Sequence, residues 1–438
     1  MELLIMKSSS SLIPSALDSS FNQPTWLERV VIRYLASVLK DCQGSLQLVL
    51  PSKHRHQFRS GKITGKNNPQ EPDATVVLHT MRPLLRLLFS GANGWSDAYI
   101  NNEWDSPRLL NVIKWALVNE IILKRATRFH HLTSLSHKRL HRANANTKKG
   151  SRRNISAHYD LGNDFFKEWL DPGMTYSAAL FKGKNLTDKR FKNTKCSDSK
   201  QILAEAQKEK YHRILELLNP RESDHIVEIG CGWGEFASQA AKNNNIKIDG
   251  VTLSEQQLLW GQEKLAHEKL SEKATLQLMD YRDISRQYDG VVSIEMFEAV
   301  GEENWDTYFK KLHGILKPGG KAVLQIITID DERFHSYRKN PDFIQRYIFP
   351  GGMLPSSEVL KQKFSQHGFS LDYQQMFGMD YAKTLSIWWE NFESQWPTIA
   401  EQGFDNRFYR LWRYYLAYCQ GGFEQGEIDV GLFVIKKY

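Results

Sequence analysis

A glycine-rich turn after a short apolar run constrains the fold more than any other feature of this chain. Residues 225–229 predict a buried strand, and Gly230, Gly232 and Gly234 follow at alternate positions before a predicted helix. Glycine tolerates positive φ angles and lets a ligand approach the backbone closely. A turn at the carboxyl end of a strand is where open α/β sheets bind nucleotide-like ligands. The pattern therefore predicts an α/β fold with a ligand site at this turn.

The segments after the turn predict a parallel, doubly wound sheet. Apolar runs indicate further strands at residues 246–253, 276–279, 290–294 and 321–327. Helical periodicity lies between them, at residues 254–269, with Ser254 as N-cap, and at residues 305–316. Strands that alternate with helices at these distances are typical of a parallel sheet covered on both faces.

Shorter elements upstream predict a small α+β unit. Helices are expected at residues 26–39, 81–88 and 106–123, and strands at residues 46–50 and 74–79. The predicted organisation is a loose serine-rich tail at 1–25, an N-terminal domain at 26–135, a basic linker at 136–155 and a second domain at 156–438. Residues near the end of the second domain are unusually rich in aromatic side chains.

Charge and cysteine content limit the functional classes. The net charge of +8 suits a polyanionic partner, which is either nucleic acid or an anionic membrane surface. The cysteines form no C-x-x-C pair and no zinc-like set, so no structural metal is expected; they are Cys42, Cys196, Cys231 and Cys419. No apolar run reaches the roughly 18 residues of a transmembrane helix, and no signal peptide is evident, so a cytoplasmic protein is predicted.

The spacing E-x-G-x-G-x-G, starting at Glu228, resembles the S-adenosylmethionine loop of Rossmann-like methyltransferases. Glu228 is expected to accept from the amino group of the cofactor, and Tyr281 to stack on its adenine. The remaining candidates around the cradle follow the glycine turn and the next two strands: Cys231, Thr252, Leu253, Ser254, Gln257, Asp280 and Arg282. For Asp280 and Arg282 a surface salt bridge is an equal alternative.

Two carboxylates end the fourth predicted strand of this domain. Because burial of an unpaired charge is costly, Glu298 indicates an active site, whereas Glu295 can be explained as a hydrogen-bonded strand end. Upstream, the dense polar and aromatic segment at residues 157–166 contains His158 and Tyr159. The alternative for His158 and Asp160 is that they cap a helix that begins near Gly162.

Together these motifs resemble the cyclopropane-fatty-acyl-phospholipid synthases and their mycolic-acid-modifying relatives. The resemblance covers roughly residues 85–435 and is carried by residues 158–163, 174–177, 228–236, 250–257, 296–298, 317–320 and 347–356. It implies a Rossmann-like class I methyltransferase with a smaller N-terminal α+β lipid-binding domain and a C-terminal aromatic lid. Tyr176 and Ser177 then belong to the cofactor site, and His158 and Tyr159 to a substrate or anion site.

The implied activity is transfer of a methyl(ene) group from S-adenosylmethionine to the cis double bond of a phospholipid acyl chain, which forms a cyclopropane. The implied partner is the inner face of the membrane, without nucleic acid, and a homodimer is left open. Several residues at helical spacing are candidates for an acyl tunnel, with ordinary core packing as the alternative: Phe404, Phe408, Leu411, Tyr415 and Cys419.

Members of this family use a bicarbonate ion as proton acceptor, and its expected ligands are only partly present. Glu298, the backbone of Ile327 and Tyr381 match, but Ala178 stands at the cysteine position and Gln325 at the histidine position. Cys419 matches a cysteine sometimes assigned to the active site, although a buried inert thiol is the alternative. The departures leave open a methyl-branched or methylene product, or a silent lipid-binding homologue. An RNA methyltransferase is disfavoured because no RNA-binding module is visible.

Overall fold

The computed structural model describes residues 23–59, 73–126, 150, 161–181, 196–243 and 245–438. Several predictions fall outside these residues and receive no structural account. They are the tail as far as residue 22, the basic linker apart from Gly150, and the candidates His158 and Tyr159.

The N-terminal unit is a small sheet covered by helices. Its four strands lie in the order β2-β1-β3-β4. The elements are α1 (Trp26–Leu39), β1 (Ser45–Val49), β2 (Arg55–Arg59), β3 (Ala74–Leu78), α2 (Arg82–Ile100), β4 (Trp104–Asp105), α3 (Leu109–Val118) and α4 (Glu120–Ala126). Helix α1 has the predicted bounds, and Thr25 and Glu28 form a capping box that fixes its start.

Two predicted helices in this unit are wrong in extent, and one strand was not predicted. The helix expected at residues 106–123 is divided at Asn119 into α3 and α4. The helix expected at 81–88 continues to Ile100, because the kink at Gly91 (φ 58°) bends α2 without ending it. Strand β2 was not predicted: its pattern is polar, and it pairs antiparallel with β1 through only one neighbour at the edge of the sheet. An edge strand with one buried position carries little hydrophobic periodicity.

The second unit is built on a seven-stranded sheet in the order β10-β11-β9-β8-β5-β6-β7. Its strands are β5 (His225–Ile229), β6 (Lys247–Thr252), β7 (Ala274–Leu278), β8 (Tyr288–Ile294), β9 (Leu316–Ile329), β10 (Phe369–Met376) and β11 (Ile428–Lys437). The chain order reverses between β5 and β8, which pair in parallel with each other. Such a switch point leaves a crevice at the carboxyl ends of the two strands.

The expectation of an all-parallel sheet is wrong at one end. Strand β11 runs antiparallel to both of its neighbours, β9 and β10. Neither β10 nor β11 was predicted, because their place in the sheet depends on pairing with strands far away in the sequence.

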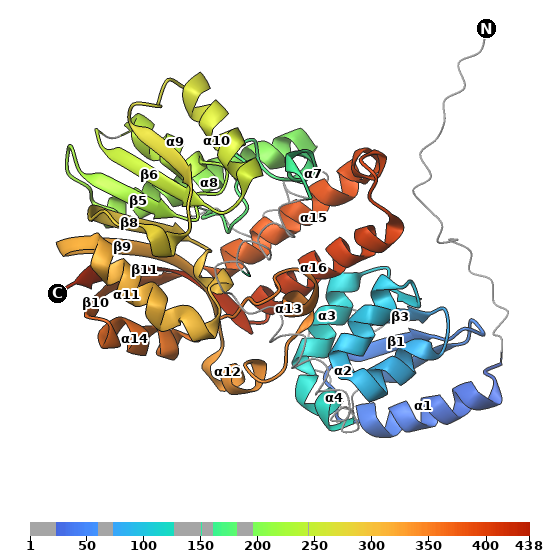
Figure 1. Ribbon diagram of the computed structural model, residues 1–438. Helices are drawn as coiled ribbons and strands as arrows, with labels where there is room; N and C mark the ends of the chain where they lie inside the picture. The colour runs from blue at the N-terminus through green and yellow to red at the C-terminus, as the bar shows by residue number, and fades with distance from the viewer. Residues whose placement is uncertain (1–22, 60–72, 127–149, 151–160, 182–195, 244) are drawn as a thin grey trace, which may run out of the picture.

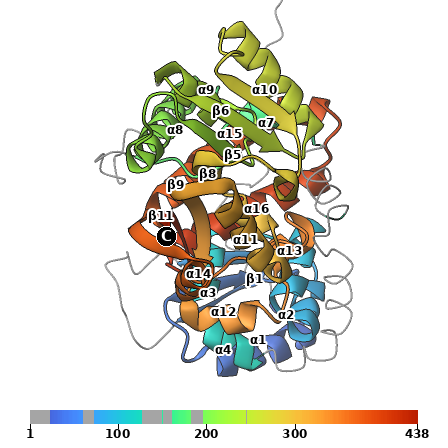
Figure 2. The ribbon, with the colours of Figure 1, turned by 60° about the vertical axis from the view of Figure 1, so that its left-hand side comes forward.

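Helices cover both faces of this sheet, as Figures 1 and 2 show. They are α7 (Asn163–Trp169), α8 (Cys196–Leu218), α9 (Glu235–Asn243), α10 (Glu255–His267), α11 (Trp305–Ile315), α12 (Asp331–Tyr337), α13 (Phe343–Tyr347), α14 (Ser357–Gln366), α15 (Gly378–Glu401) and α16 (Asn406–Glu424). Short 3₁₀ turns lie at Tyr281–Asp283, Phe297–Ala299 and Glu302–Asn304. Helix α7 begins close to Gly162, as predicted, and Gly162 is its N-cap.

The aromatic segment near the C-terminus forms a helical hairpin inserted between two strands. Helices α15 and α16 follow β10 and precede β11, so both ends of the hairpin are anchored in the sheet. Helix α16 reaches the N-terminal unit and packs on α2 and α3 (Figure 1). One buried core therefore runs through both units. No helix among the described residues is long and apolar enough to cross a membrane.

Candidate functional site

The glycine turn between β5 and α9 has the backbone geometry that the sequence predicts. Gly230, Gly232 and Gly234 have φ angles of 82°, 51° and 80°. A Cβ atom on Gly230 would lie 2.8 Å from Met296, whereas one on Gly232 would meet nothing within 4 Å. Gly232 therefore faces open space, and its missing side chain leaves room for a ligand.

Two amides of this turn hold it against the next strand. The N–H groups of Gly230 and Cys231 both donate to the carbonyl oxygen of Val251, at 2.9 and 3.0 Å. The turn thus leaves space for a ligand next to a fixed backbone. The N–H groups of Gly230 and Cys231 are already bound to Val251, so they are not available to a ligand.

A cavity of about 690 Å³ begins at the turn. Its lining includes most of the predicted cofactor residues: Tyr176, Ser177, Glu228, Gly230, Cys231, Gly232, Thr252, Leu253, Gln257 and Tyr281. Many of them lie at or just after the carboxyl ends of β5, β6 and β7, next to the switch point of the sheet. The fold therefore brings together residues that are spread over about a hundred positions of the sequence.

Four predicted cofactor residues do not line the cavity. Gly234 lies in the turn and donates its N–H to Cys231. The hydroxyl of Ser254 caps α10 by accepting from the N–H of Gln257. Arg282 and Asp280 form an ion pair at 2.6 Å, but both side chains are largely buried, so it is not the surface salt bridge of the alternative.

Glu228 is a buried carboxylate with unmet hydrogen-bonding capacity. Its side chain ends β5 inside the cavity, and among the described residues its Oε2 atom has no hydrogen-bond partner. Burial raises the pKa of Glu228 to about 8, and the charge of Lys210 opposes this rise. A cationic amine brought by a ligand would satisfy the free oxygen. Together with the open position at Gly232, this fits the S-adenosylmethionine expected here.

Lys210 is a buried charged residue beside the site that the sequence analysis missed. Its side chain is fully buried, and its Nζ atom donates to the hydroxyl of Ser177 at 2.6 Å. Burial lowers the pKa of Lys210 to about 8, and the charges of Glu295, Asp171 and Glu228 oppose this shift. Lys210 precedes Ile214 by one helical turn, and this spacing on the buried face of α8 could have identified it.

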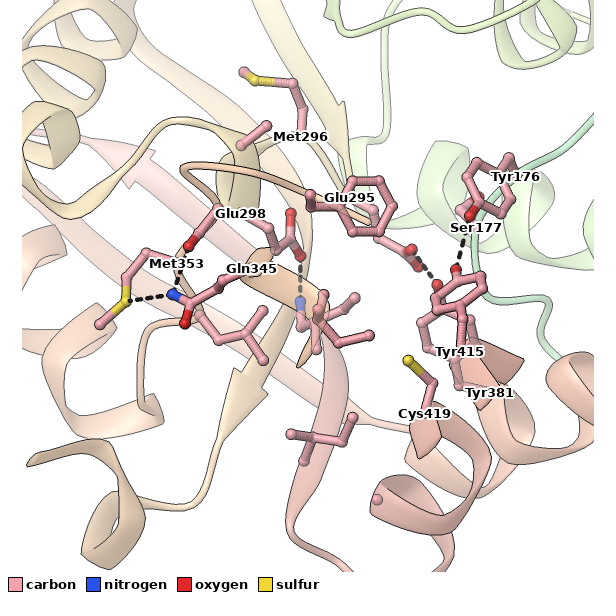
Figure 3. Close-up of a pocket in the computed structure, with 18 of the residues that line it drawn as sticks. Tyr176, Ser177, Glu295, Met296, Glu298, Gln345, Met353, Tyr381, Tyr415 and Cys419 are labelled. Carbon is pink, nitrogen blue, oxygen red and sulfur yellow. Dashed lines mark hydrogen bonds between the residues drawn. The ribbon is translucent and has the colours of Figure 1, made fainter. Parts of the chain in front are cut away.

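Glu298, the predicted catalytic carboxylate, lies in the cavity on the 3₁₀ turn after β8. Its Oε1 atom accepts from the N–H of Ile327 at 2.5 Å (Figure 3), so two residues expected to hold an external anion bind each other instead. Among the described residues its Oε2 atom has no partner. Burial, followed by the charge of Glu295, raises the pKa of Glu298 to about 8.

The signature segment at residues 347–356 positions this carboxylate. The N–H of Met353 donates to the backbone carbonyl of Glu298 at 2.8 Å. Gln345 reinforces the loop by donating to the carbonyl of Gly352 at 2.8 Å (Figure 3). The family-like motif therefore acts on the site through backbone contacts.

Glu295 is a central member of the site, whereas the sequence alone explained it as a strand end. Its Oε1 atom accepts from the N–H of Ala178 at 2.8 Å and from the side-chain amide of Gln325 at 2.7 Å. Its Oε2 atom accepts from the hydroxyl of Tyr381 at 2.7 Å (Figure 3). Burial raises the pKa of Glu295, while these donors and Lys210 oppose the rise.

The residues present do not fit the expected bicarbonate ion. Tyr381, Gln325 and the backbone of Ala178 all bind the carboxylate of Glu295, and Ile327 binds that of Glu298. Gln325 does not itself line the cavity. The position expected for a bound anion is thus filled by a side chain of the protein.

The predicted acyl tunnel is only partly correct. Tyr415 and Cys419 of α16 line the cavity, and the hydroxyl of Tyr415 lies 2.7 Å from that of Tyr176 (Figure 3). Phe404 and Phe408 instead pack on Phe165 of α7, with ring centroids 5.0 and 5.3 Å apart, and Leu411 joins the same core. Burial, Asp342 and Glu295 raise the pKa of Cys419, so its thiol stays protonated at neutral pH.

The cavity extends from the carboxylates to the N-terminal unit. Its lining there comes from α2, α3, α4 and the segment from α12 to α13: Ser90, Ala92, Asn93, Leu117, Glu120, Lys124, Arg333, Asn340 and Pro341. Arg333 forms an ion pair with Glu120 at 2.7 Å, which links α12 to α4. Both units therefore build one continuous site.

Known proteins resemble this chain in sequence and architecture. The model of the family described as mycolic acid cyclopropane synthetase matches residues 146–433. Tuberculostearic acid methyltransferase UfaA1 from Mycobacterium tuberculosis is 35% identical over 377 residues, which cover 85% of each chain. The cyclopropane-fatty-acyl-phospholipid synthase of Escherichia coli is 34% identical over 357 residues, covering 80% of this chain and 85% of that one.

A solved structure agrees with the fold. Mycolic acid cyclopropane synthase CmaA1, complexed with SAH and CTAB, superposes with a TM-score of 0.57 at 29% identity, over 65% of this chain and 98% of that chain. Sequence, fold and cofactor cradle thus agree on an S-adenosylmethionine-dependent methyltransferase of class I architecture. This chain belongs to the mycolic acid cyclopropane synthetase family.

Proposed function

We propose that this protein transfers a methyl(ene) group from S-adenosylmethionine to the cis double bond of an unsaturated phospholipid acyl chain and forms a cyclopropane. The observation that carries the proposal is the continuous cavity, which joins the cofactor turn, the two carboxylates and the N-terminal unit. A slender apolar substrate can enter at the N-terminal unit and bring its double bond to the cofactor. The names of the relatives support a lipid substrate.

The chemistry sets clear requirements for the site. The π electrons of the alkene bond to the methyl carbon of the cofactor as the carbon–sulfur bond breaks, and one proton of the transferred methyl must then leave so that its electron pair closes the ring. The protein must orient the alkene, exclude water and stabilise positive charge on the chain. It must also accept one proton.

The described residues meet these requirements. Tyr176, Tyr381 and Tyr415 present aromatic rings around the carboxylates, and such faces stabilise cations through their quadrupoles. Glu295, whose carboxylate accepts three hydrogen bonds, offers a proton-accepting oxygen, and the carboxyl group of Glu298 lies in the same cavity. The buried packing of α15 and α16 around them keeps this end of the cavity enclosed.

We also infer that the N-terminal unit faces the membrane as a peripheral surface. Large exposed apolar side chains gather on its helices: Trp26, Leu27, Val30, Tyr34, Leu85, Phe89, Val118 and Ile121. Helices α1, α2 and α4 lie together at the same end of the molecule in Figures 1 and 2. The cavity opens next to these helices, where Lys124 and Arg333 line it and both pair with Glu120.

A methylene-branched product is the second candidate, and the contacts of Glu295 favour it. Three hydrogen bonds hold the carboxylate of Glu295 at a fixed position relative to the cationic chain; their donors are Ala178, Gln325 and Tyr381. If a 1,2-hydride shift first moves the cation to the methylated carbon, loss of a proton from the same methyl group gives a methylene branch (C=CH2). Ring and methylene products are isomers, so neither needs a reductant.

The test is mass spectrometry of lipids from cells that lack a cyclopropane synthase, express this chain and receive methyl-deuterated methionine. We expect acyl chains that carry one additional carbon and retain two deuterium atoms. Catalytic hydrogenation of the sample identifies the methylene isomer, because it takes up hydrogen under mild conditions that leave the ring intact. Cells with an empty vector are the control.

Other outcomes would change the assignment. Retention of three deuterium atoms would show that the proton leaves from the acyl chain and that a methyl branch forms. No labelled lipid, with S-adenosylmethionine still bound by the purified protein, would contradict the proposed function and favour a silent lipid-binding protein.

A further inference from the structure

Glu295 adopts a backbone conformation that a glutamate rarely takes. Its φ angle is 47°, in the left-handed region that favours glycine. Holding a non-glycine residue there is energetically unfavourable, and such residues cluster at functional sites. The N–H of Glu295 donates to the carbonyl of Gln325 at 2.8 Å, which fixes the turn. The side chain at this position is therefore retained at an energetic cost.

The strained turn directs a buried carboxylate at three donors. The N–H of Ala178, the amide of Gln325 and the hydroxyl of Tyr381 approach it within 2.7 to 2.8 Å. These donors come from three separate parts of the chain. Tyr381 was expected to hold an external anion, and Ala178 and Gln325 stand at the cysteine and histidine positions of that expected site. Three donors stabilise the ionised form of a carboxylate.

The neighbouring carboxyl group differs in its contacts. Glu298 accepts a hydrogen bond from the backbone amide of Ile327, and burial, followed by the charge of Glu295, raises its pKa. Of two coupled carboxyl groups, the one with more donors ionises first. Glu295 is thus the carboxylate that can take up a proton when positive charge forms in the cavity.

We infer that Glu295 supplies, from within the chain, the carboxylate that accepts the proton lost during methyl transfer, so that turnover needs no bound bicarbonate. A lone pair on its oxygen takes one proton from the transferred methyl group, and the released C–H electron pair forms the last carbon–carbon bond of the product. Glu295 becomes neutral and returns the proton to solvent after product release. This inference rests on the proposed function.

Two substitutions test the role of the Glu295 carboxylate separately from the stability of the fold. Glu295→Gln keeps the size of the side chain but removes the proton acceptor. Glu295→Gly removes the side chain, suits the positive φ angle and leaves the three donors around an empty space. Glu272→Gln, at an exposed position before β7, is the control for a change of one surface charge.

Turnover is measured with unsaturated phospholipid vesicles, in buffer stripped of carbon dioxide and in buffer with added bicarbonate. We expect equal rates in both buffers for the unmodified protein and for Glu272→Gln. Glu295→Gln should lose at least about 100-fold in rate, as expected when a general base is removed. Glu295→Gly should lose a similar factor, and added bicarbonate should restore about tenfold or more.

A binding measurement does not depend on turnover. The NMR signal of ¹³C-bicarbonate should broaden with Glu295→Gly and stay unchanged with the unmodified protein. Unmodified protein that binds the ion, or that loses activity without it, would overturn the inference, as would full activity of Glu295→Gln. If the unmodified protein makes no labelled lipid in either buffer, the proposed function itself fails, and the NMR result still decides whether Glu295 occupies the anion position.

Discussion

At the scale of single residues, two buried glutamates of the cavity are expected to have different roles because their surroundings differ. Glu228 ends β5 beside the cofactor turn and keeps one oxygen without a partner among the described residues. Glu295 ends β8, where three donors hold its carboxylate. The first is therefore suited to bind a ligand cation, and the second to accept a proton.

The raised pKa of Glu228 predicts that cofactor binding releases a proton. Free Glu228, with a pKa of about 8, is mostly neutral near pH 7, and a cofactor ammonium favours its ionised form. Between about pH 6 and pH 7 the affinity should therefore rise with pH, by up to about tenfold per unit. Calorimetry in two buffers of different ionisation enthalpy measures the proton directly.

Glu228→Gln should bind S-adenosylmethionine more weakly and without this proton release. Glu298→Gln is the matched comparison, because its carboxyl group is also buried and has a similarly raised pKa. It should abolish turnover but leave cofactor binding and proton release intact. Equal proton release by Glu228→Gln and the unmodified protein would contradict the assignment.

At the scale of elements, the α15–α16 hairpin joins the two units. The buried guanidinium of Arg410 donates to the carbonyls of Tyr99 and Trp104, both at 2.6 Å, and to the carboxylate of Asp105 at 3.1 Å. It also lies 4.0 Å from the ring centre of Tyr99. One side chain of α16 thus satisfies the end of α2 and the short strand β4.

Arg410→Ala should destabilise this junction by about 3 kcal/mol, because it leaves buried carbonyl oxygens without donors. The measurement is the free energy of unfolding from denaturant titration. Arg407→Ala, on the exposed side of the same helix, is the control and should change stability by less than about 0.5 kcal/mol. Similar values for the two variants would show that the junction does not depend on this guanidinium.

At the scale of the whole molecule, exposed apolar surface is unevenly placed. The apolar side chains exposed on α1, α2, α3 and α4 lie at the end of the protein where the cavity meets the N-terminal unit. The overall charge of +8 favours contact with an anionic bilayer. A lipid tail could then move from the bilayer into the cavity without crossing water.

Phe89→Asp and Ile121→Asp should each weaken binding to vesicles of anionic phospholipid by roughly tenfold, because each removes one inserted apolar group and adds negative charge. Sedimentation of the vesicles measures the bound fraction. Leu259→Asp is the matched control: Leu259 is 57% exposed, as Phe89 is, but lies on α10 in the other unit. Equal loss in all three variants would rule out a specific membrane face.

Local pattern accounts for much of the fold. The bounds of α1 and β5, the cap at Ser254 and the glycine turn agree with prediction because each depends on neighbours within a few residues. The edge strand β2 and the strands β10 and β11 were missed. Their stability comes from pairing with distant strands, which periodicity within one segment does not reveal.

The sequence by itself determined the fold class, the cofactor turn and the family, because these depend on motifs of ordered, closely spaced residues. Only the tertiary structure decided what Glu295 and Lys210 contact. The partners of Glu295 are Ala178, Gln325 and Tyr381, which lie between 30 and 117 residues away in the chain. Such contacts form when sheet pairing and helix packing bring distant segments together. The sequence alone explains Glu295 as the end of a strand, whereas the fold places its carboxylate at the centre of the site.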